Sequence, residues 1–147
     1  MTDHKKFETI KKLGIPEFYN NYYWLNDKNI LHPETIFVFG SNEAGRHGLG
    51  AALQAKLDYG AILGQGVGFM GRSYGIPTKD KNMKILDLDT IGQHIVDFVE
   101  ITKTSGRHFY VTPVGCGLAG YTPAQIAPMF QGARRCWFPI TFKTFID

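Results

Sequence analysis

Two glycine-rich stretches are the parts of this chain whose residue types best suit the binding of a phosphorylated ligand. The first, GRHGLG at positions 45–50, runs directly into AALQAKL, a segment of strong helix formers. The second, GCGLAGY at positions 115–121, is followed by Thr122 and Pro123, which are typical of a helix start. N–H groups in the first turn of a helix have no partner within the helix and bind anions, and glycine lets a phosphate approach the main chain. The sequence therefore predicts two phosphate-binding loops.

Neither loop is a standard nucleotide fingerprint. The first contains no GKS or GKT, and its glycine order is GxxGxG rather than GxGxxG. Alone, it is equally typical of a tight turn that packs a helix against a sheet. Two N–H-rich loops that face each other suit a diphosphate better than a single phosphate, because each loop can hold one phosphoryl group. Together the two loops favour a nucleotide-like ligand.

Other chemistries are less well supported by the residue pattern. Cys116 lies between two glycines with no basic partner nearby in the sequence, so we interpret it as a small loop residue rather than a nucleophile. Ser41 lies outside any GxSxG motif, which disfavours a serine hydrolase. No metal site and no cofactor are predicted, because no HxxxH or CxxC pairing occurs among the two cysteines and the five histidines, His4, His32, His47, His94 and His108.

The elements expected to position these loops alternate between strands and helices. Ile36 to Phe39 is an apolar run typical of a buried strand, which we expect to end at Gly40. Arg72 to Pro77 is the next expected strand, and the sequence TKD follows it directly. Further strands are expected at His108–Val114 and at Cys136–Phe142, the latter near an edge of the sheet. Helices are expected at Asp3–Leu13 and at Leu88–Thr102, the second with a cap at Asp87 or Asp89. A last helix is expected at Ala124–Gly132, with a kink at Pro128.

This alternation predicts an α/β domain with a mixed, mostly parallel sheet and right-handed crossovers. Ligands of such sheets bind beyond the carboxyl ends of the strands. The segments 41–50, 78–80 and 115–121 would then meet at one rim of the sheet.

Length, charge and composition limit the remaining classes of function. A chain of 147 residues predicts one domain over 1–147, with a helix and an aromatic segment within 1–35 packed on the core. The net charge of +3 is mild and scattered along the chain, so a nucleic-acid surface is not indicated. No window approaches the roughly 18 apolar residues of a membrane span, and the N-terminal segment lacks the apolar core of a signal peptide. Two cysteines without CxxC spacing fit a reducing compartment. We expect a cytoplasmic protein with no membrane partner.

Three segments, FGSNEAGRHGLGAALQAKLDYG, SYGIPTKD and VTPVGCGLAGYTPAQIAPMF, carry a family resemblance and lie within residues 36–60, 73–80 and 111–130. They resemble macrodomains, the ADP-ribose-binding modules. The order of a glycine-rich helix entry, a strand ending in TK and a GCGL loop is similar to the branch that removes ADP-ribose from modified proteins through a lysine. It is also similar to macro-like proteins of phages and bacteria. The resemblance implies a three-layer α/β/α fold around the mixed sheet.

The resemblance also implies which residues bind the ligand. The segment 48–50 would contact the diphosphate and the proximal ribose, and the segment 115–118 would wrap the diphosphate from the other side. Asn42 matches an asparagine that hydrogen-bonds the distal ribose. Asp27 matches a carboxylate that accepts from the adenine amino group, although an aspartate in an LNDKN sequence is more often a turn former. The implied ligand contacts are Asn42, Gly48, Leu49, Gly50, Gly115, Cys116, Gly117, Leu118, Ala119, Gly120, Tyr121 and Asp27.

Lys79 resembles the lysine that attacks the anomeric carbon of the distal ribose in this branch. That attack needs a neutral amine, and Asp80, if close to the amine, would keep it charged. An equally typical role for Lys79 is that of a solvated lysine in a turn. The branch carries an acidic proton-transfer residue directly after GCGL, whereas this chain has Ala119 there. Hydrolysis would therefore need a substitute, and the candidates in the sequence are His47, Asp80 and Glu43.

These observations predict a protein that binds ADP-ribose or a related nucleotide diphosphate, free or attached to a macromolecule. In the enzyme hypothesis it hydrolyses an ADP-ribosyl linkage with Lys79 as the nucleophile. In the alternatives it is a non-catalytic reader or sink for ADP-ribose or a cyclic nucleotide, a phosphatase acting on ADP-ribose 1″-phosphate, or a structural protein with no ligand. A nucleic acid is an expected partner only when it is ADP-ribosylated.

Overall fold

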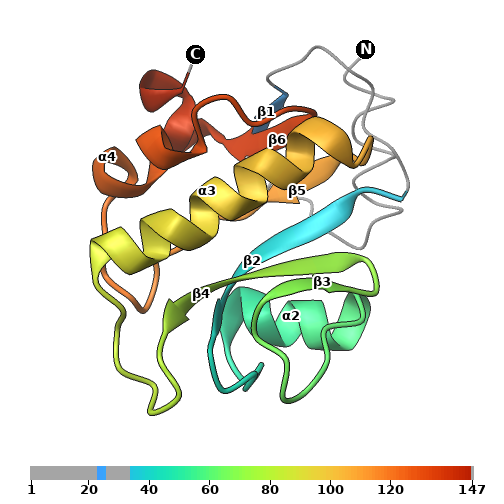
Figure 1. Cartoon of the computed structure of the whole chain (residues 1–147), viewed down its shortest axis with the longest axis vertical. Coiled ribbons are helices and arrows are strands. Elements are labelled where there is room, and N and C mark those ends of the chain that lie inside the picture. Colours follow the sequence, from blue (N-terminus) through green and yellow to red (C-terminus); the bar gives the residue numbers. More distant parts are fainter. Residues whose placement is uncertain (1–22, 26–33, 147) are drawn as a thin grey trace.

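A six-stranded mixed sheet forms the centre of the computed structural model, which describes residues 23–25 and 34–146 (Figure 1). The strand order is β1-β6-β5-β2-β4-β3. The inner pairings are parallel, and the two edge strands β1 and β3 pair antiparallel with their neighbours. This confirms the predicted α/β class with a mixed, mostly parallel sheet. The strands are β1 Tyr23–Leu25, β2 Ile36–Asn42, β3 Gly68–Met70, β4 Ser73–Lys79, β5 Phe109–Val111 and β6 Cys136–Pro139.

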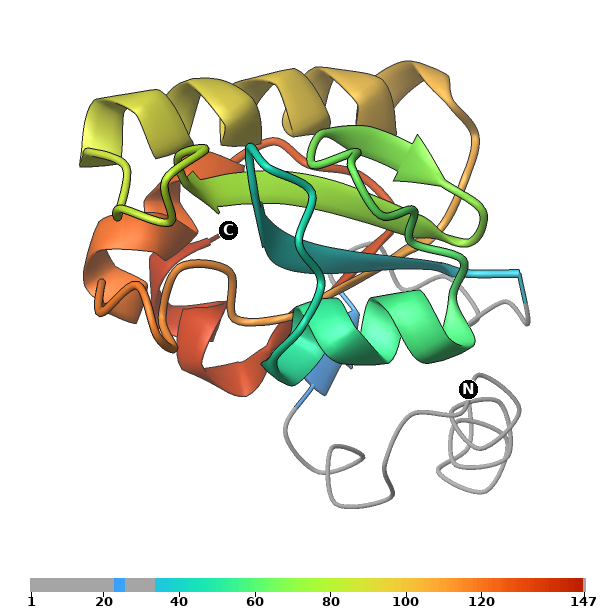
Figure 2. The ribbon, with the colours of Figure 1, turned by 90° about the horizontal axis from the view of Figure 1, so that it is seen from below.

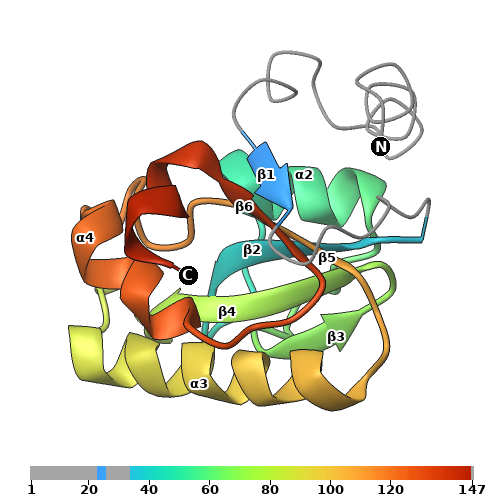
Figure 3. The same ribbon diagram turned by 90° about the horizontal axis from the view of Figure 1, so that it is seen from above.

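Helices lie on both faces of the sheet. Figures 2 and 3 show α2 on one side of the strands and the longer α3 on the opposite side. The short helix α4 continues into the 3-10 helix η2, and a second 3-10 helix, η3, follows β6. None of the described helices combines the length and apolar character needed to cross a bilayer. The bounds are α2 Gly50–Asp58, α3 Leu88–Thr104, α4 Pro123–Ile126, η2 Ala127–Phe130 and η3 Ile140–Phe145.

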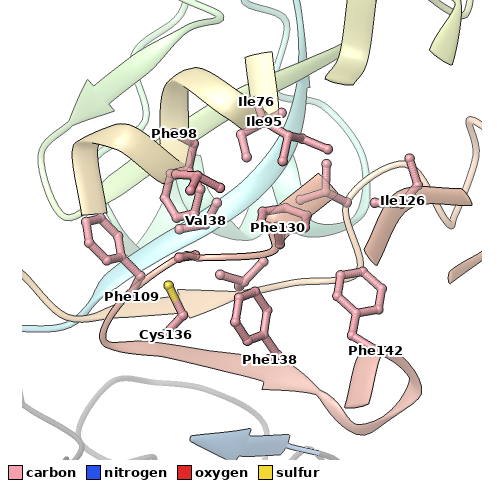
Figure 4. Packing of buried hydrophobic residues seen from close by; sticks show 14 of the residues in the cluster. Val38, Ile76, Ile95, Phe98, Phe109, Ile126, Phe130, Cys136, Phe138 and Phe142 are labelled. Atoms are coloured by element: carbon pink, nitrogen blue, oxygen red, sulfur yellow. The ribbon is translucent and has the colours of Figure 1, made fainter. Parts of the chain in front are cut away.

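The core is divided between the two faces by the alternation of side chains along β2. Ile36 and Val38 belong to the cluster beneath α3, whereas Phe37 and Phe39 belong to the cluster beneath α2. All four side chains are buried, as a continuous apolar run predicts for a central strand. Figure 4 shows the larger cluster, in which rings from α3, η2, β6 and η3 meet. The rings in contact are those of Phe98, Phe109, Phe130, Phe138 and Phe142.

The two long helices differ in how they pack on the sheet. Helix α3 buries the predicted stripe, which includes Ile91, Ile95 and Phe98, and the Asp87 side chain caps it by accepting from the Thr90 N–H at 2.8 Å. Helix α2 buries only small side chains, those of Ala52 and Ala55. Through these alanines α2 packs against β2 on this face of the sheet.

Several predicted boundaries are wrong. The strand β2 does not end at Gly40 but continues to Asn42, because its pairing with β4 persists through Ser41 to Asn42, where the register shifts. The strand expected at His108–Val114 is only Phe109–Val111. The helix expected at Ala124–Gly132 ends at Ile126 and continues as 3-10 structure through Pro128, a residue that has no N–H for an α-helical bond.

The C-terminal strand is also shorter than expected. It ends at Pro139, where η3 begins, rather than at Phe142. Strand β6 is the neighbour of the edge strand β1, and its last residue, Pro139, lies opposite Tyr23. The proline is tolerated because it stands at the end of the strand. The helix expected at Asp3–Leu13 and most of the aromatic segment lie outside the described residues.

Candidate functional site

A cavity of about 580 Å³ lies where β2, β4 and the segment after β5 reach the same edge of the sheet. Parallel strands bring their carboxyl ends to one edge, which is the expected place for a ligand in an α/β sheet. All three segments that the sequence brings to this rim contribute to the cavity. The lining residues are Gly40, Ser41, Asn42, Arg46, Gly48, Leu49, Gly50, Ala51, Ala52, Thr78, Lys79, Met83, Thr112, Pro113, Val114, Gly115, Cys116, Gly117, Leu118 and Ala119.

The charged groups that line the cavity are all cationic. They belong to Arg46 and Lys79, while no Asp, Glu or His of the described residues contributes to the lining. The cavity therefore favours an anionic ligand.

The first glycine-rich loop is held in shape by the amide of Asn42. The Asn42 Nδ2 donates to the Arg46 carbonyl at 2.6 Å, and the Arg46 N–H donates to the Asn42 Oδ1 at 2.8 Å. The hydroxyl of Ser41 donates to the Gly66 carbonyl and attaches this loop to the segment before β3. Asn42 lines the cavity as expected, but its two polar atoms also have this internal role.

His47 lies outside the cavity lining and is 2% exposed. Its Nε2 is 2.9 Å from both the Ile62 and the Gln65 carbonyl oxygens, so this nitrogen is the N–H donor. Its ring stands edge-on to Phe39 at a centroid distance of 5.4 Å. The side chain therefore joins the first loop to the 60–71 segment and does not reach the cavity as a proton-transfer group.

Two lining glycines are not required by the fold. A Cβ at Gly48 or Gly117 would meet no atom of the described residues within 4 Å, and neither glycine has a left-handed φ. Gly66 is different, because a Cβ there would lie 2.0 Å from the Asn42 carbonyl oxygen. The space left open at Gly48 and Gly117 is therefore available to a ligand that approaches the main chain.

Main-chain donors accompany both of these glycines. Helix α2 begins at Gly50 with no side-chain cap and no acidic residue in its first turn, so its first N–H groups have no partner within the helix. On the second loop, the N–H groups of Gly117, Leu118 and Ala119 have no acceptor among the described residues. This loop is closed by the Tyr121 N–H, which donates to the Gly115 carbonyl at 2.9 Å.

Lys79 is the last residue of β4, lies opposite Asn42 in the sheet and is half-buried. Within the described part of the chain it forms no ion pair, and it lines the cavity. Asp80 does not line the cavity. Its Oδ1 accepts from the N–H groups of Asn82 at 2.8 Å and Lys84 at 3.0 Å, so the carboxylate serves the turn that follows β4.

The remaining predicted residues are divided between the cavity and its support. Cys116 lines the cavity, and burial raises the pKa of its thiol to about 11, so it is a neutral thiol at physiological pH. Gly120 and Tyr121 do not line it, and the Tyr121 hydroxyl instead donates to the Leu86 carbonyl at 2.6 Å. Asp27 lies outside the described residues.

Sequence reasoning did not name several lining residues as ligand contacts, among them Arg46, Thr78 and Met83. Arg46 lies inside the first glycine-rich loop, so its position was a usable signal. Thr78 ends the buried part of β4, and its Oγ1 donates to the Ser41 carbonyl at 3.2 Å. Met83 lies in the turn after β4, and no sequence motif marks it.

Comparison of the chain with protein-family models, curated proteins and solved structures finds no match. Among the described residues, no group of three or more His, Cys, Asp or Glu side chains is placed to hold a metal ion. The geometry and charge of the cavity are therefore the features that indicate its ligand.

Proposed function

We propose that the cavity binds a nucleotide diphosphate of the ADP-ribose class. The observation that carries this proposal is the pair of glycines, Gly48 and Gly117, that line one cavity from different loops and leave open space where a Cβ would be. Each glycine is accompanied by main-chain N–H groups that have no acceptor among the residues that the structure describes. A diphosphate has two adjacent phosphoryl groups, which two such loops can hold separately.

Charge and size support the same ligand class. A diphosphate carries about two negative charges at neutral pH, and Arg46 and Lys79 are the charged side chains of the lining. The volume of about 580 Å³ is within the range of cavities that enclose small ligands. Helices on opposite faces of the sheet support the macrodomain-like three-layer fold that is part of this proposal.

Binding is the function that the site supports best. Glycohydrolysis needs a group that transfers a proton, and such groups contribute about 10²–10⁴-fold to the rate. The position after GCGL is Ala119, and of the described residues neither His47, Asp80 nor Glu43 lines the cavity as its substitute. A lining without a proton-transfer group favours a protein that binds the nucleotide as a reader or sink and does not hydrolyse it.

Lys79 supports hydrolysis as a second candidate function. Lys79 lines the cavity and forms no ion pair with a carboxylate of the described residues. A lysine in this setting can attack a sugar carbon, with slow turnover because a proton-transfer group is missing.

Calorimetric titration with ADP-ribose tests binding. We expect micromolar affinity in the wild type and loss of binding in Gly117→Glu, because the new carboxylate would enter the cavity and repel the diphosphate. Ala124→Glu is the matched control, since it adds the same charge at an exposed residue of α4 outside the lining. Binding retained in Gly117→Glu, or absent in the folded wild type, refutes the proposal and directs the search to other diphosphates and cyclic nucleotides.

Turnover is tested separately with an ADP-ribosylated protein as the substrate. Lys79→Ala should abolish ADP-ribose release, and Lys79→Arg should retain binding without turnover because guanidinium keeps the charge but is not a nucleophile. Unchanged release in both variants excludes the lysine mechanism. Phosphate release from ADP-ribose 1″-phosphate would identify the phosphatase alternative.

A further inference from the structure

The turn that follows Lys79 carries an apolar side chain into the cavity. Strand β4 continues beyond Lys79 as a narrow hairpin, in which Lys79 pairs with Ile85 and the Asp80 N–H donates to the Lys84 carbonyl at 2.8 Å. The Met83 N–H closes the turn by donating to the Asp80 carbonyl at 3.0 Å. A three-residue hairpin loop of this kind places its last residue in the left-handed region, where glycine or asparagine is favoured.

Met83 occupies that left-handed position, with φ of +64°. Only one other non-glycine residue of the described chain, Arg135, has a positive φ. A methionine in this conformation is strained, because its Cβ crowds the backbone. Backbone strain of this kind persists at functional sites, where the side chain is needed in a particular place.

The Met83 side chain lies where a ligand would meet it. It lines the cavity and is 37% exposed. Leu49 and Leu118, which line the same cavity from the two glycine-rich loops, are 68% and 70% exposed. The lining thus combines main-chain donors for phosphate with three exposed apolar side chains. A thioether is flexible and polarizable, so it adapts to a ring placed against it.

We propose that Met83 is a ligand-contacting residue whose side chain packs against a sugar or base ring of the bound nucleotide, beside Lys79. This inference rests on the proposed function, since it deepens the description of the same site. The strain at Met83 is retained because glycine, which the turn favours, would provide no such contact.

Three variants separate the contact from the strain. Met83→Gly relieves the backbone and removes the side chain, so we expect its melting temperature to rise by about 3 °C and its affinity for ADP-ribose to fall by about fivefold. Met83→Leu retains an apolar side chain and should bind within about twofold of the wild type. Arg135→Gly is the matched backbone control outside the cavity lining and should leave affinity unchanged.

The outcomes distinguish this inference from the proposed function. Wild-type affinity in Met83→Gly overturns the role of Met83, and so does a fall in the melting temperature of this variant. Either result leaves the proposed function standing. Absence of ADP-ribose binding in the wild type refutes the proposed function. In that case Met83 has no ADP-ribose to contact, and this inference is overturned together with the proposed function.

Discussion

The thiol of Cys116 reports on the cavity, and its reactivity can be calculated from its burial. Burial raises the pKa of this thiol from about 9 to about 11, with no neighbouring charge among the causes. At pH 8 this lowers the thiolate fraction by about 100-fold relative to an exposed cysteine. A more basic thiolate is also more nucleophilic, which raises its rate constant for exchange with a disulfide by about eightfold. We therefore expect Cys116 to react about tenfold more slowly than a free thiol.

The measurement is exchange with a neutral aromatic disulfide, dithiodipyridine, followed by absorbance and by mass spectrometry of the modified peptide. A synthetic peptide spanning 113–120 supplies the free-thiol rate, and Cys136, which is 0% exposed, should stay unmodified. The Cys116 rate should rise with pH until about pH 11, and a ligand in the cavity should slow it further. A rate equal to that of the peptide, or a plateau near pH 9, would show that the thiol is not buried as described.

The same pKa has a consequence for folding. In the unfolded chain the thiol ionises near pH 9, whereas in the folded chain it remains neutral until about pH 11. Its contribution to stability is therefore complete below pH 9 and is lost as the pH rises toward 11. Urea unfolding of the wild type and Cys116→Ser between these pH values isolates this contribution, and identical pH dependence in both would contradict it.

Three further predictions concern stability and are measured by urea unfolding. Phe130→Ala should cost about 4 kcal/mol, because Phe130 is fully buried among the rings of α3, β6 and η3; a cost below about 1 kcal/mol would contradict this packing. Gly66→Ala should cost about 3 kcal/mol or prevent folding, since its Cβ would lie 2.0 Å from the Asn42 carbonyl oxygen. Wild-type stability in this variant would show that the main chain at Gly66 does not lie so close to Asn42. The Thr90 N–H lowers the pKa of Asp87, so this cap stabilises the fold above the ordinary aspartate pKa and its contribution is lost as the pH falls through the lowered value. Asp87→Asn should remove that part of the acid dependence, and an unchanged acid slope would refute it.

Local patterns predicted the elements that local interactions determine. The apolar run 36–39 identified the central strand, and the spacing of apolar residues from Ile91 to Thr102 identified α3. Its cap, Asp87, is one of the two candidates that the sequence offered, the other being Asp89. The two glycine-rich loops and Lys79 were correctly assigned to one rim, because the topology of a parallel sheet brings strand ends together.

Features that depend on partners distant in sequence were not predictable in this way. The extension of β2 to Asn42 is set by its pairing with β4, and the shortening of β6 by the start of η3. The cavity-lining role of Met83 depends on the hairpin after β4, which has no glycine to mark it. The internal role of His47 depends on two carbonyl groups of the 60–71 segment, which lie 15 and 18 residues away in the sequence.

The bonds from Ser41, Asn42 and His47 mean that the first loop is rigid before any ligand arrives. A rigid loop loses little conformational entropy when it binds, so more of the contact free energy appears as affinity. The 60–71 segment supplies the carbonyl groups of Ile62, Gln65 and Gly66 that receive three of these bonds, although none of its residues lines the cavity. Substitutions in this segment should therefore weaken ligand binding without touching the ligand, because a more mobile loop loses more conformational entropy when it binds.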